Sequence, residues 1–372
     1  MNNFLLLGYY GFGNFGDEAI LGHIINIIKA HVKDPNITVF TSDVEKTSEE
    51  YQLKSVYRFS FRGIIDNIFS CDYLILGGGS LLQNVTSLKS LLYYLFMIFI
   101  ARLFDKKVVL FAQGIGPLNG YFSRNLTINM LRQACLITVR DEKSKNLLDK
   151  YGIRSFLTAD LLWTLNLEGM KDEKTSSKQI VGIQLRGWRN LSHQKLILLA
   201  EAVLNKFDAA NTIFKIISLQ SSLDSLVCQK FLGILKSINN KTYVEFINDK
   251  NVEKELKTIA NLDYLVAMRF HAGLASIKAG VPTMMLSYDP KVEELAKGAD
   301  LPFVDVKNLN KKNLEENLDK LLTESEEIVS NMKKFEVEME AKSAQNVKLL
   351  LKLLNKYKDL NKEAVEEEKS DE

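Results

Sequence analysis

The chain is poor in cysteine and histidine, and the few that it has are scattered. Its 372 residues include three cysteines, Cys71, Cys135 and Cys228, and no C-x-x-C pair. This excludes a disulfide framework and a zinc site of the usual spacing, so we expect buried thiols in a reducing compartment. The four histidines form no cluster at metal-ligand spacing, and no metal is predicted. The amino terminus lacks a basic segment before its short apolar run, which predicts a cytoplasmic protein.

An excess of one charge is also missing. Lys and Arg number 48 against 46 Asp and Glu, a net charge of +2, which argues against a dedicated nucleic-acid binder. With 46% hydrophobic and 25% charged residues, a disordered chain is excluded. Residues 357–372 hold three lysines against seven acids. The rest of the chain is therefore mildly basic, which suits an anionic substrate or a membrane surface.

No hydrophobic run is long enough to span a bilayer. The longest covers residues 91–101, whereas a transmembrane helix needs ~20 residues. Basic residues follow it as far as Lys107. Two interpretations stay open for 91–107: a buried helix of a large domain, or a helix that also lies on a membrane surface.

Several signatures of nucleotide and ester chemistry are absent. The chain has no G-x-x-x-x-G-K-[ST] phosphate loop, no Asp-x-Asp following a strand and no G-x-S-x-G elbow. These absences exclude a P-loop enzyme and an α/β-hydrolase of the common kind.

Short apolar runs alternate with helical patterns along the chain. The runs predict buried strands at 4–7, 37–40, 73–76, 108–111, 136–139, 180–185, 213–219, 264–267 and 283–286. Such alternation predicts an α/β fold of two Rossmann-like, doubly wound domains facing a cleft. We expect an N-terminal domain over 1–165, a linker over 166–179, a C-terminal domain over 180–324, a helical segment over 325–358 and an acidic tail over 359–372.

Glycine-rich stretches follow three strands of the first half. The first, Gly8–Glu18, brings backbone N–H groups to the start of a helix, although its spacing differs from a dinucleotide fingerprint. Asp17 there is either a helix N-cap or a carboxylate that accepts a proton from a sugar hydroxyl. The second runs through Gly77–Gly79 into Ser80, where we expect a helix to begin. Gln83 and Asn84 after it either bind hydroxyls or cap the backbone.

Further polar residues follow strands. Gln113 opens another glycine-rich loop, and Arg140 and Arg186 each come directly after a strand. For Arg140 a salt bridge to the acids that follow it is the alternative to a role in the cleft. Arg269 and His271 lie between a strand and a helix, and Lys291 follows the next strand. Arginine binds carboxylate or phosphate, and histidine transfers protons near pH 7, so this pair points to chemistry on an anion.

Taken together, GYYGFGNFGDEAIL at the start, Gly77–Gln83, Gln113–Pro117 and the pair MRFHA and SYDPKV resemble the polysaccharide pyruvyl transferase family. The nearest match is its CsaB-like branch. The resemblance extends from residue 4 to about residue 295. It implies a GT-B-like fold, phosphoenolpyruvate as co-substrate with no cofactor, and an N-acetylmannosamine-type sugar on a lipid-linked glycan precursor as acceptor. The implied product is a 4,6-pyruvate ketal, which surface-layer proteins recognise. Asn84 departs from the family pattern, which has Asp there.

The resemblance and the residues together assign the candidate site. His271 is the expected acid/base, Arg269 the main anion clamp and Asp17 the base on the acceptor side. Substrate-binding residues are expected at Arg186, Arg140, Lys291, Gly13, Asn14, Gly78, Gly79, Ser80, Gln83 and Gln113. With a lipid-linked acceptor, the protein is expected at the inner membrane face. Two other functions remain open: a GT-B glycosyltransferase using a nucleotide sugar, and a non-catalytic glycan- or anion-binding module.

Overall fold

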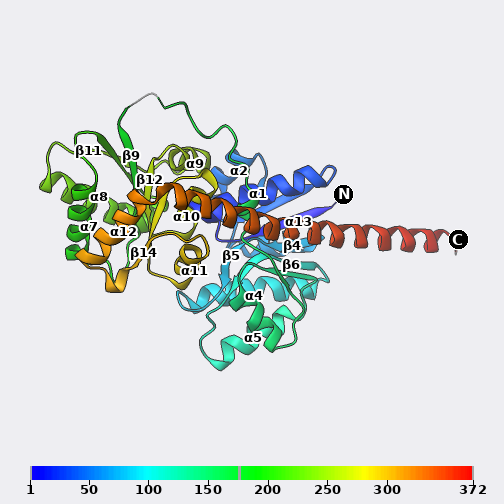
Figure 1. The fold of residues 1–372 in the computed structure, drawn as a ribbon. Helices are drawn as coiled ribbons and strands as arrows, with labels where there is room; N and C mark the ends of the chain where they lie inside the picture. The colour runs from blue at the N-terminus through cyan, green and yellow to red at the C-terminus, as the bar shows by residue number, and fades with distance from the viewer. Residues whose placement is uncertain (1, 175–176, 371–372) are drawn as a thin grey trace. The chain divides into compact units, whose positions relative to one another are not determined.

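The computed structural model describes residues 2–174 and 177–370, with side chains in the last helix described as far as residue 357. Residues 175–176 of the expected linker and 371–372 of the expected tail lie outside this description. The chain forms two compact units. Unit 1 comprises residues 1–12, 16–165 and 339–372, and unit 2 comprises residues 13–15 and 166–338. Each unit is a parallel sheet with helices around it (Figure 1).

Unit 1 is built on a parallel sheet in the order β3-β2-β1-β4-β6-β7-β8, with β5 paired to β6. Its strands are β1 Asn3–Leu7, β2 Asn36–Thr41, β3 Lys54–Tyr57, β4 Tyr73–Leu76, β5 Gly79–Leu82, β6 Lys107–Ile115, β7 Leu136–Val139 and β8 Phe156–Leu157. Its helices are α1 Phe15–His31, α2 Val44–Tyr51, α3 Phe61–Ser70, α4 Leu88–Leu103, α5 Tyr121–Leu131 and α6 Glu142–Lys150, with a 3-10 turn at Leu161–Thr164.

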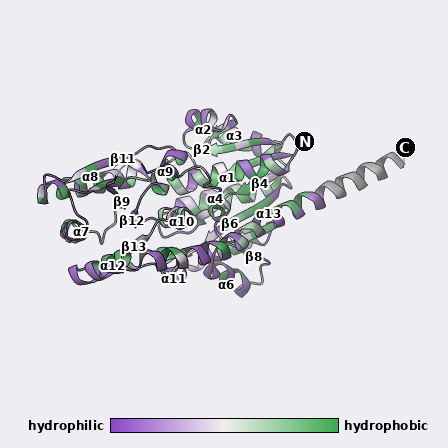
Figure 2. Cartoon of the chain, turned by 45° about the horizontal axis from the view of Figure 1, so that its top comes forward, coloured by the Kyte–Doolittle hydropathy of each residue, from purple (hydrophilic) through white to green (hydrophobic). Residues whose placement is uncertain are grey.

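The central strands of unit 1 are apolar along their whole length because helices cover both faces of the sheet. Every residue of β4 and β7 is buried, and β2, β4 and β6 are largely green in Figure 2. The helices begin at polar caps: the side chains of Asp43, Ser60, Ser87 and Asp141 accept the N–H groups of α2, α3, α4 and α6.

Unit 2 repeats this plan with a parallel sheet in the order β11-β10-β9-β12-β13-β14. Its strands are β9 Gln179–Gln184, β10 Thr212–Ile217, β11 Tyr243–Ile247, β12 Tyr264–Ala267, β13 Thr283–Ser287 and β14 Phe303–Asp305. Its helices are α7 His193–Lys206, α8 Ser221–Ile238, α9 Val252–Ala260, α10 Phe270–Ala279, α11 Pro290–Gly298 and α12 Lys311–Thr323, with a 3-10 turn at Val306–Asn308.

The last helix, α13 (Ser325–Ser370), belongs to both units. In unit 2, the buried carboxylate of Glu336 pairs with Lys278 at 3.3 Å. In unit 1, the buried side chain of Asn346 accepts a hydrogen bond from Thr158 at 2.9 Å and donates one to the carbonyl of Ala159 at 3.0 Å. We expected a helical segment that stopped at 358 and a separate tail, but the helix continues to Ser370.

The predicted fold class is confirmed, and each of the nine predicted strands overlaps a strand of the two sheets. The prediction that a helix begins at Ser80 is wrong, because Gly79–Leu82 form the short strand β5. Gly79 has φ +89°, a conformation open to glycine, and pairs with Gln113 of β6. The chain therefore stays extended after the three glycines, and the next helix, α4, begins at Leu88.

Candidate functional site

In unit 1, Asp17 lies close to the glycine turn that follows β4. A Cβ atom placed on Gly79 would lie 3.0 Å from Asp17 Oδ1, so the carboxylate contacts the turn. The N-cap alternative for Asp17 is wrong, because α1 begins two residues earlier at Phe15. Asp17 lies in the first turn instead, where the helix dipole stabilises its negative charge. This position leaves the proposed role at a sugar hydroxyl open.

Arg140 forms a buried ion pair at the same edge of the sheet. Its Nη1 lies 2.5 Å from Asp160 Oδ2, and its Nη2 donates to Ser80 Oγ at 3.0 Å. The side chains of Arg140 and Asp160 are 6% and 2% exposed. Arg140 thus forms a salt bridge, as the alternative interpretation had it, but the partner is Asp160 and not one of the acids that follow Arg140. The first of those acids, Asp141, caps α6 instead. Arg140 therefore holds Ser80 and neutralises Asp160.

Gln113 holds the glycine turn in place through hydrogen bonds to its backbone. Its side chain is fully buried, and its amide nitrogen donates to the carbonyls of Leu76, Gly77 and Gly78. Its amide oxygen has no hydrogen-bond partner. Gln113 was predicted to bind substrate, but its donors are engaged by the backbone of the turn, so it positions Gly78 and does not reach the surface.

Gln83 and Asn84 cap the backbone. Gln83 Oε1 accepts the N–H groups of Val85 and Thr86, and Asn84 exchanges two hydrogen bonds of 2.7 Å with the backbone of Asn119. The sequence left open whether these two side chains bind hydroxyls or cap the backbone, and the structure shows that they cap the backbone. Asn84, the departure from the family pattern, thus fastens one loop to another.

Gly13 and Asn14 were expected on the N-terminal side of the site. By their contacts, residues 13–15 group with unit 2, where the N–H of Phe15 donates to the carbonyl of Leu219 at 3.0 Å. This segment therefore contacts the loop that follows β10.

In unit 2, Arg269 is tied into a buried network. Its Nε and Nη2 donate to the two carboxylate oxygens of Asp224 at 2.6 and 2.7 Å, and Nη2 also donates to Gln220 Oε1 at 2.9 Å. Asp224 is fully buried, and Arg269 is 7% exposed. Such a bidentate pair fixes the guanidinium and compensates its charge. Arg269 was expected to be the main anion clamp, but two of its nitrogens are already committed to this pair.

Arg186 is in a different situation. Its Nη1 donates to the hydroxyl of Tyr288 at 2.7 Å, and its guanidinium lies 5.6 Å from the ring centroid of Trp188 and 5.1 Å from that of Tyr288. Its Nε is buried without a hydrogen-bond partner, and no described carboxylate pairs with it. Burial raises the pKa of Tyr288, a shift that the cations Arg186 and Arg269 oppose, so this hydroxyl stays neutral. Among the described residues, Arg186 is thus a half-buried cation without a carboxylate partner.

His271 and Lys291 begin the helices that follow the neighbouring strands. His271 is half-buried in the first turn of α10, and its ring stands edge-on to Phe270 at 5.1 Å between centroids. Lys291 lies in the first turn of α11, where its N–H donates to the cap Asp289. Carboxyl ends of parallel strands share one edge of the sheet, so β9, β12 and β13 present Arg186, Arg269, His271 and Lys291 along that edge.

Sequence reasoning missed the partners that fix these cations: Asp224, Gln220, Tyr288 and Asp160. The available signal was weak, because no glycine cluster marks the loop after β10. It consisted of Gln220, the residue before α8, and one acid in the first turn of that helix, Asp224. Of the other histidines, His23 hydrogen-bonds to Thr164 at 2.8 Å and His31 to the carbonyl of Ile27 at 2.9 Å. Among the described residues, no group of His, Cys, Asp and Glu has the geometry of a metal site.

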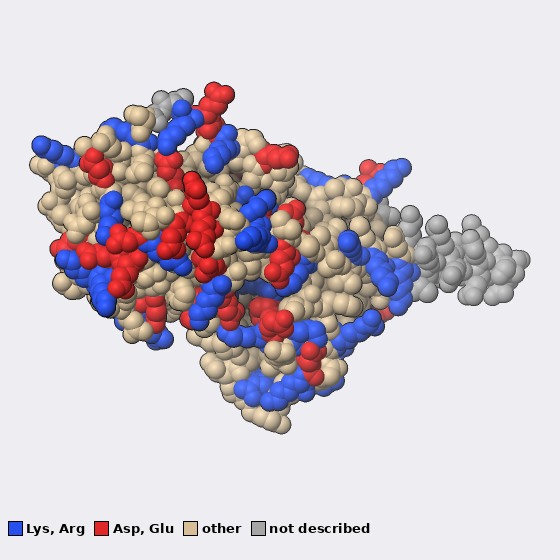
Figure 3. Space-filling view, viewed as in Figure 1, with Lys and Arg blue, Asp and Glu red and all other residues tan. Residues whose placement is uncertain are grey.

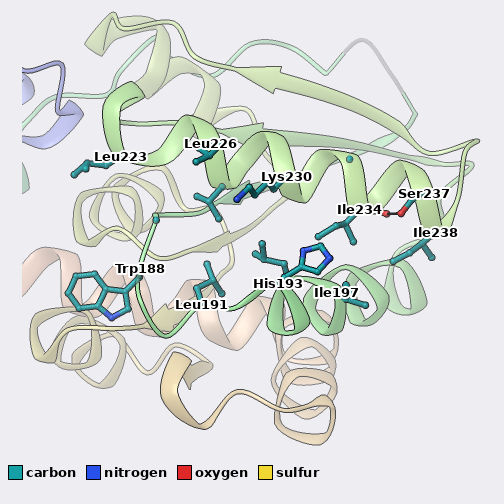
Figure 4. Close-up of a pocket in the computed structure, with 14 residues that line it drawn as sticks. Trp188, Leu191, His193, Ile197, Leu223, Leu226, Lys230, Ile234, Ser237 and Ile238 are labelled. Atoms are coloured by element: carbon teal, nitrogen blue, oxygen red, sulfur yellow. Dashed lines mark hydrogen bonds between the residues drawn. The ribbon is translucent and has the colours of Figure 1, made fainter.

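A groove of ≈ 710 Å³ lies beside α7 and α8 in unit 2 (Figure 4). Its lining is mostly apolar, from Trp188 and Leu191 at one end to Ile238 at the other, with Lys230 and His193 pointing into it. Arg186 and His271 are not among its lining residues. The groove adjoins the cationic edge at Trp188, whose ring lies 5.6 Å from the Arg186 guanidinium.

The fold is a two-domain GT-B-like architecture, as comparison with solved structures shows. UDP-GlcNAc 2-epimerase from Methanocaldococcus jannaschii matches with 15% identity over 87% of this chain and 93% of its own, at a TM-score of 0.63. The Neisseria meningitidis UDP-GlcNAc 2-epimerase bound to UDP-GlcNAc matches with 14% identity over 96% and 100%, at 0.63. The S. aureus MnaA structure with UDP matches with 10% identity over 97% and 98%, at 0.66.

The sequence narrows this class to one family. The model of the polysaccharide pyruvyl transferase family matches residues 14–290, and this chain belongs to that family. It is therefore assigned as a transferase. A search of curated proteins found no significant match.

Proposed function

We propose that this protein transfers the enolpyruvyl group of phosphoenolpyruvate to an N-acetylmannosamine-type sugar of a lipid-linked cell-wall polysaccharide precursor. The product is a 4,6-pyruvate ketal, and phosphate is released. Membership of the pyruvyl transferase family supports this reaction. The observation that carries it is Arg186, a half-buried guanidinium without a carboxylate partner among the described residues, on the same sheet edge as His271.

The proposed reaction has three steps. A proton is added to the vinyl CH₂ of phosphoenolpyruvate, which becomes a methyl group and leaves a cation-like carbon at C2. One sugar hydroxyl attacks C2 and loses its proton. A second hydroxyl then attacks the same carbon and the phosphate leaves, taking up the remaining proton. The site therefore needs a general acid, a base for hydroxyls and cations for carboxylate and phosphate.

Unit 2 carries groups for the donor half of this reaction. We assign Arg186 as the principal anion contact, since a guanidinium without a counter-ion gains most from binding a carboxylate or phosphate. Lys291 and the first N–H groups of α10 and α11 add positive potential. His271 is the acid that protonates the vinyl carbon. Arg269, held by Asp224, keeps the segment before His271 in place.

Unit 1 carries groups for the acceptor half. Asp17, in contact with the turn at Gly79, is assigned as the base that accepts a hydroxyl proton. Ser80 is held by Arg140 and offers a hydroxyl beside the same turn. A sugar presents several hydroxyls to such a surface of backbone and side-chain oxygens, so this edge is matched to a carbohydrate.

The first experiment is a thermal unfolding titration. Millimolar phosphoenolpyruvate should raise the unfolding midpoint, since a ligand at ~100 times its Kd adds about 2.7 kcal/mol of stability. Arg186→Ala should abolish the rise. Arg189→Ala is the matched control, because this exposed arginine near the same Trp188 ring should leave the rise unchanged. His271→Ala should keep the rise but slow phosphate release from an alkyl N-acetylmannosaminide acceptor by ~10²–10⁴-fold.

A nucleotide-sugar glycosyltransferase is the second candidate, and UDP in the S. aureus MnaA structure favours testing it. UDP and UDP-GlcNAc serve as the competing ligands in the same titration. A rise with these alone, and none with phosphoenolpyruvate, would replace pyruvyl transfer by glycosyl transfer. Phosphate release at the wild-type rate in His271→Ala would remove this histidine from the chemistry.

A further inference from the structure

Helix α4 (Leu88–Leu103) of unit 1 is apolar on two faces. One face packs into the core, where residues such as Leu91, Leu95 and Ile98 are buried. The other carries exposed apolar residues at steps of four, four, three and four: Leu88, Leu92, Phe96, Phe99 and Leu103. At about 100° per residue, these five side chains fall within an arc of about 80°. A helix covering a globular domain normally presents polar residues there.

The two helices that pack beside α4 also carry exposed aromatic side chains. Helices α3 and α5 pack beside α4, and in Figure 1 the labels of α4 and α5 lie next to each other. On α5, Tyr121 is 81% exposed and Phe122 is 70% exposed. On α3, Phe61 and Phe69 are exposed as well. We call this set the α4 surface; it comprises Phe61, Phe69, Leu88, Leu92, Phe96, Phe99, Leu103, Tyr121 and Phe122.

The charge on α4, α5 and the segments between them is one-sided, whereas α3 carries one base and one acid, Arg62 and Asp66. Residues 73–140 contain a single acid, Asp105, against seven basic residues, although the whole chain is nearly balanced. Arg140 is paired with Asp160 in the interior and Arg102 with Asp105 at 3.9 Å, which leaves Lys89, Lys106, Lys107, Arg124 and Arg132. On α4 itself, Lys89 and Arg102 flank the stripe, one on each side. In Figure 3 the region where α4 and α5 lie in Figure 1 is largely tan, with Lys and Arg and a few Asp and Glu side chains on it.

We propose that the α4 surface docks the protein on an anionic lipid bilayer, with α4 lying in the plane of the interface. Apolar and aromatic side chains enter the boundary of headgroups and acyl chains, and the flanking cations bind the lipid phosphates. Among the described residues, no helix combines the length and the apolar character that a span requires, and α4 has 16 residues. A second copy of the chain is a poorer occupant, because two such basic surfaces repel each other.

The same helix also holds the glycine-rich loop of the candidate acceptor edge. The hydroxyl of Tyr94 donates to the carbonyl of Gly8 at 3.2 Å, and that of Tyr93 to the carbonyl of Arg58 at 3.0 Å. Because α4 would then contact both the bilayer and this loop, docking would hold the loop near the membrane surface. The use of the surface to reach a lipid-linked acceptor rests on the proposed function, whereas the docking itself does not.

Flotation with lipid vesicles tests the proposal. The full chain should float with vesicles of equal parts phosphatidylcholine and phosphatidylglycerol, should not float with phosphatidylcholine alone, and should be released by salt. Phe96→Ser with Phe99→Ser should weaken binding by tenfold or more, on the order of what half-exposed aromatic side chains gain on burial. Lys89→Ala should weaken it about fivefold.

Matched variants in unit 2 provide the control. Leu223→Ser with Leu226→Ser removes two exposed apolar side chains from α8 and should leave flotation unchanged. Equal flotation of the Phe96/Phe99 variant and the wild type would overturn the proposal. A wild type that does not float, whether monomeric or dimeric through this surface by light scattering, would overturn it too. Phosphoenolpyruvate stabilisation of the wild type is measured separately, and its absence counts against the proposed function and leaves docking intact.

Discussion

The pair Arg269–Asp224 separates a structural arginine from a ligand-binding one, and Asp224→Asn tests this directly. The substitution keeps the shape of the side chain and removes its charge. Asp224 accepts hydrogen bonds from Arg269 at 2.6 and 2.7 Å, from the side chain of Gln184 at 3.3 Å and from the backbone of Gln220 at 3.1 Å. With the carboxylate neutralised, the buried guanidinium loses the negative charge of Asp224.

Removing one partner of a buried pair typically costs ~3–5 kcal/mol. We therefore expect Asp224→Asn to lower the free energy of unfolding by about that amount in a urea titration. Asp319→Asn is the matched control, because it breaks the exposed pair with Lys206, worth about 0–1 kcal/mol. Asp224→Leu combined with Arg269→Met should recover most of the loss, since an apolar pair of similar volume needs no compensating charge.

The reasoning is refuted if Asp224→Asn costs no more than Asp319→Asn. In that case the Arg269 guanidinium would be solvated, and its assignment as the main anion clamp would return. An intermediate check is Arg186→Ala, which should change stability little because Arg186 has no ionic partner among the described residues, yet should abolish stabilisation by phosphoenolpyruvate.

Three further predictions concern the turn, the thiols and the last helix. Gly79→Ala should lower the free energy of unfolding by about 1 kcal/mol or more, because φ is +89° and the new Cβ would lie 3.0 Å from Asp17 Oδ1. The control is Gly233→Ala on α8, where a Cβ meets no atom within 4 Å and no loss of stability is expected. Urea unfolding of both variants measures the difference. Burial raises the pKa of the Cys228 thiol to about 12, from an ordinary value of 9.0. The unfolded chain thus loses this proton before the folded one, so stability is present below pH 9 and declines from there toward pH 12; Cys228→Ala should show a smaller decline in melts across that range. Asn346→Ala should cost about 1–3 kcal/mol by leaving buried backbone and hydroxyl groups unpaired, whereas equal midpoints for variant and wild type would show that water replaces the amide.

The fold was predictable because its signal is periodic. Buried parallel strands read as short apolar runs, and the glycine turns after β1 and β4 mark their carboxyl ends. The strands that were missed, such as β3 and β11, lie at the edges of their sheets, and their residues are half exposed and less apolar. The short strand β5 was hidden by its glycines, since nothing in the sequence reveals that Gly79 pairs with Gln113.

The location of the site was predictable from the sequence, but the ion-pair and hydrogen-bond partners of its residues were not. Arg269 and Arg186 both follow a strand, and the sequence makes them equivalent. They differ because Asp224 comes from a helix 45 residues earlier and reaches only Arg269. Likewise the partner of Arg140 is Asp160, which lies 20 residues beyond it and after another helix. Pairings across such distances depend on packing, so a single sequence does not reveal which cation is already neutralised.

The path of α13 has a consequence for how the chain is made. Unit 1 is interrupted in sequence by all of unit 2 and is completed only by residues from 339 onward. Thr158 and Ala159 gain their hydrogen bonds to Asn346 only when this last part of the chain has been made. The same holds for Cys135, whose sulfur lies 3.7 Å from the hydroxyl of Tyr357. On the ribosome, the first half of the protein is thus synthesised early and finished last. In a stalled nascent chain, the surface of unit 1 that α13 later covers would be exposed to chaperones and proteases while unit 2 is still being synthesised.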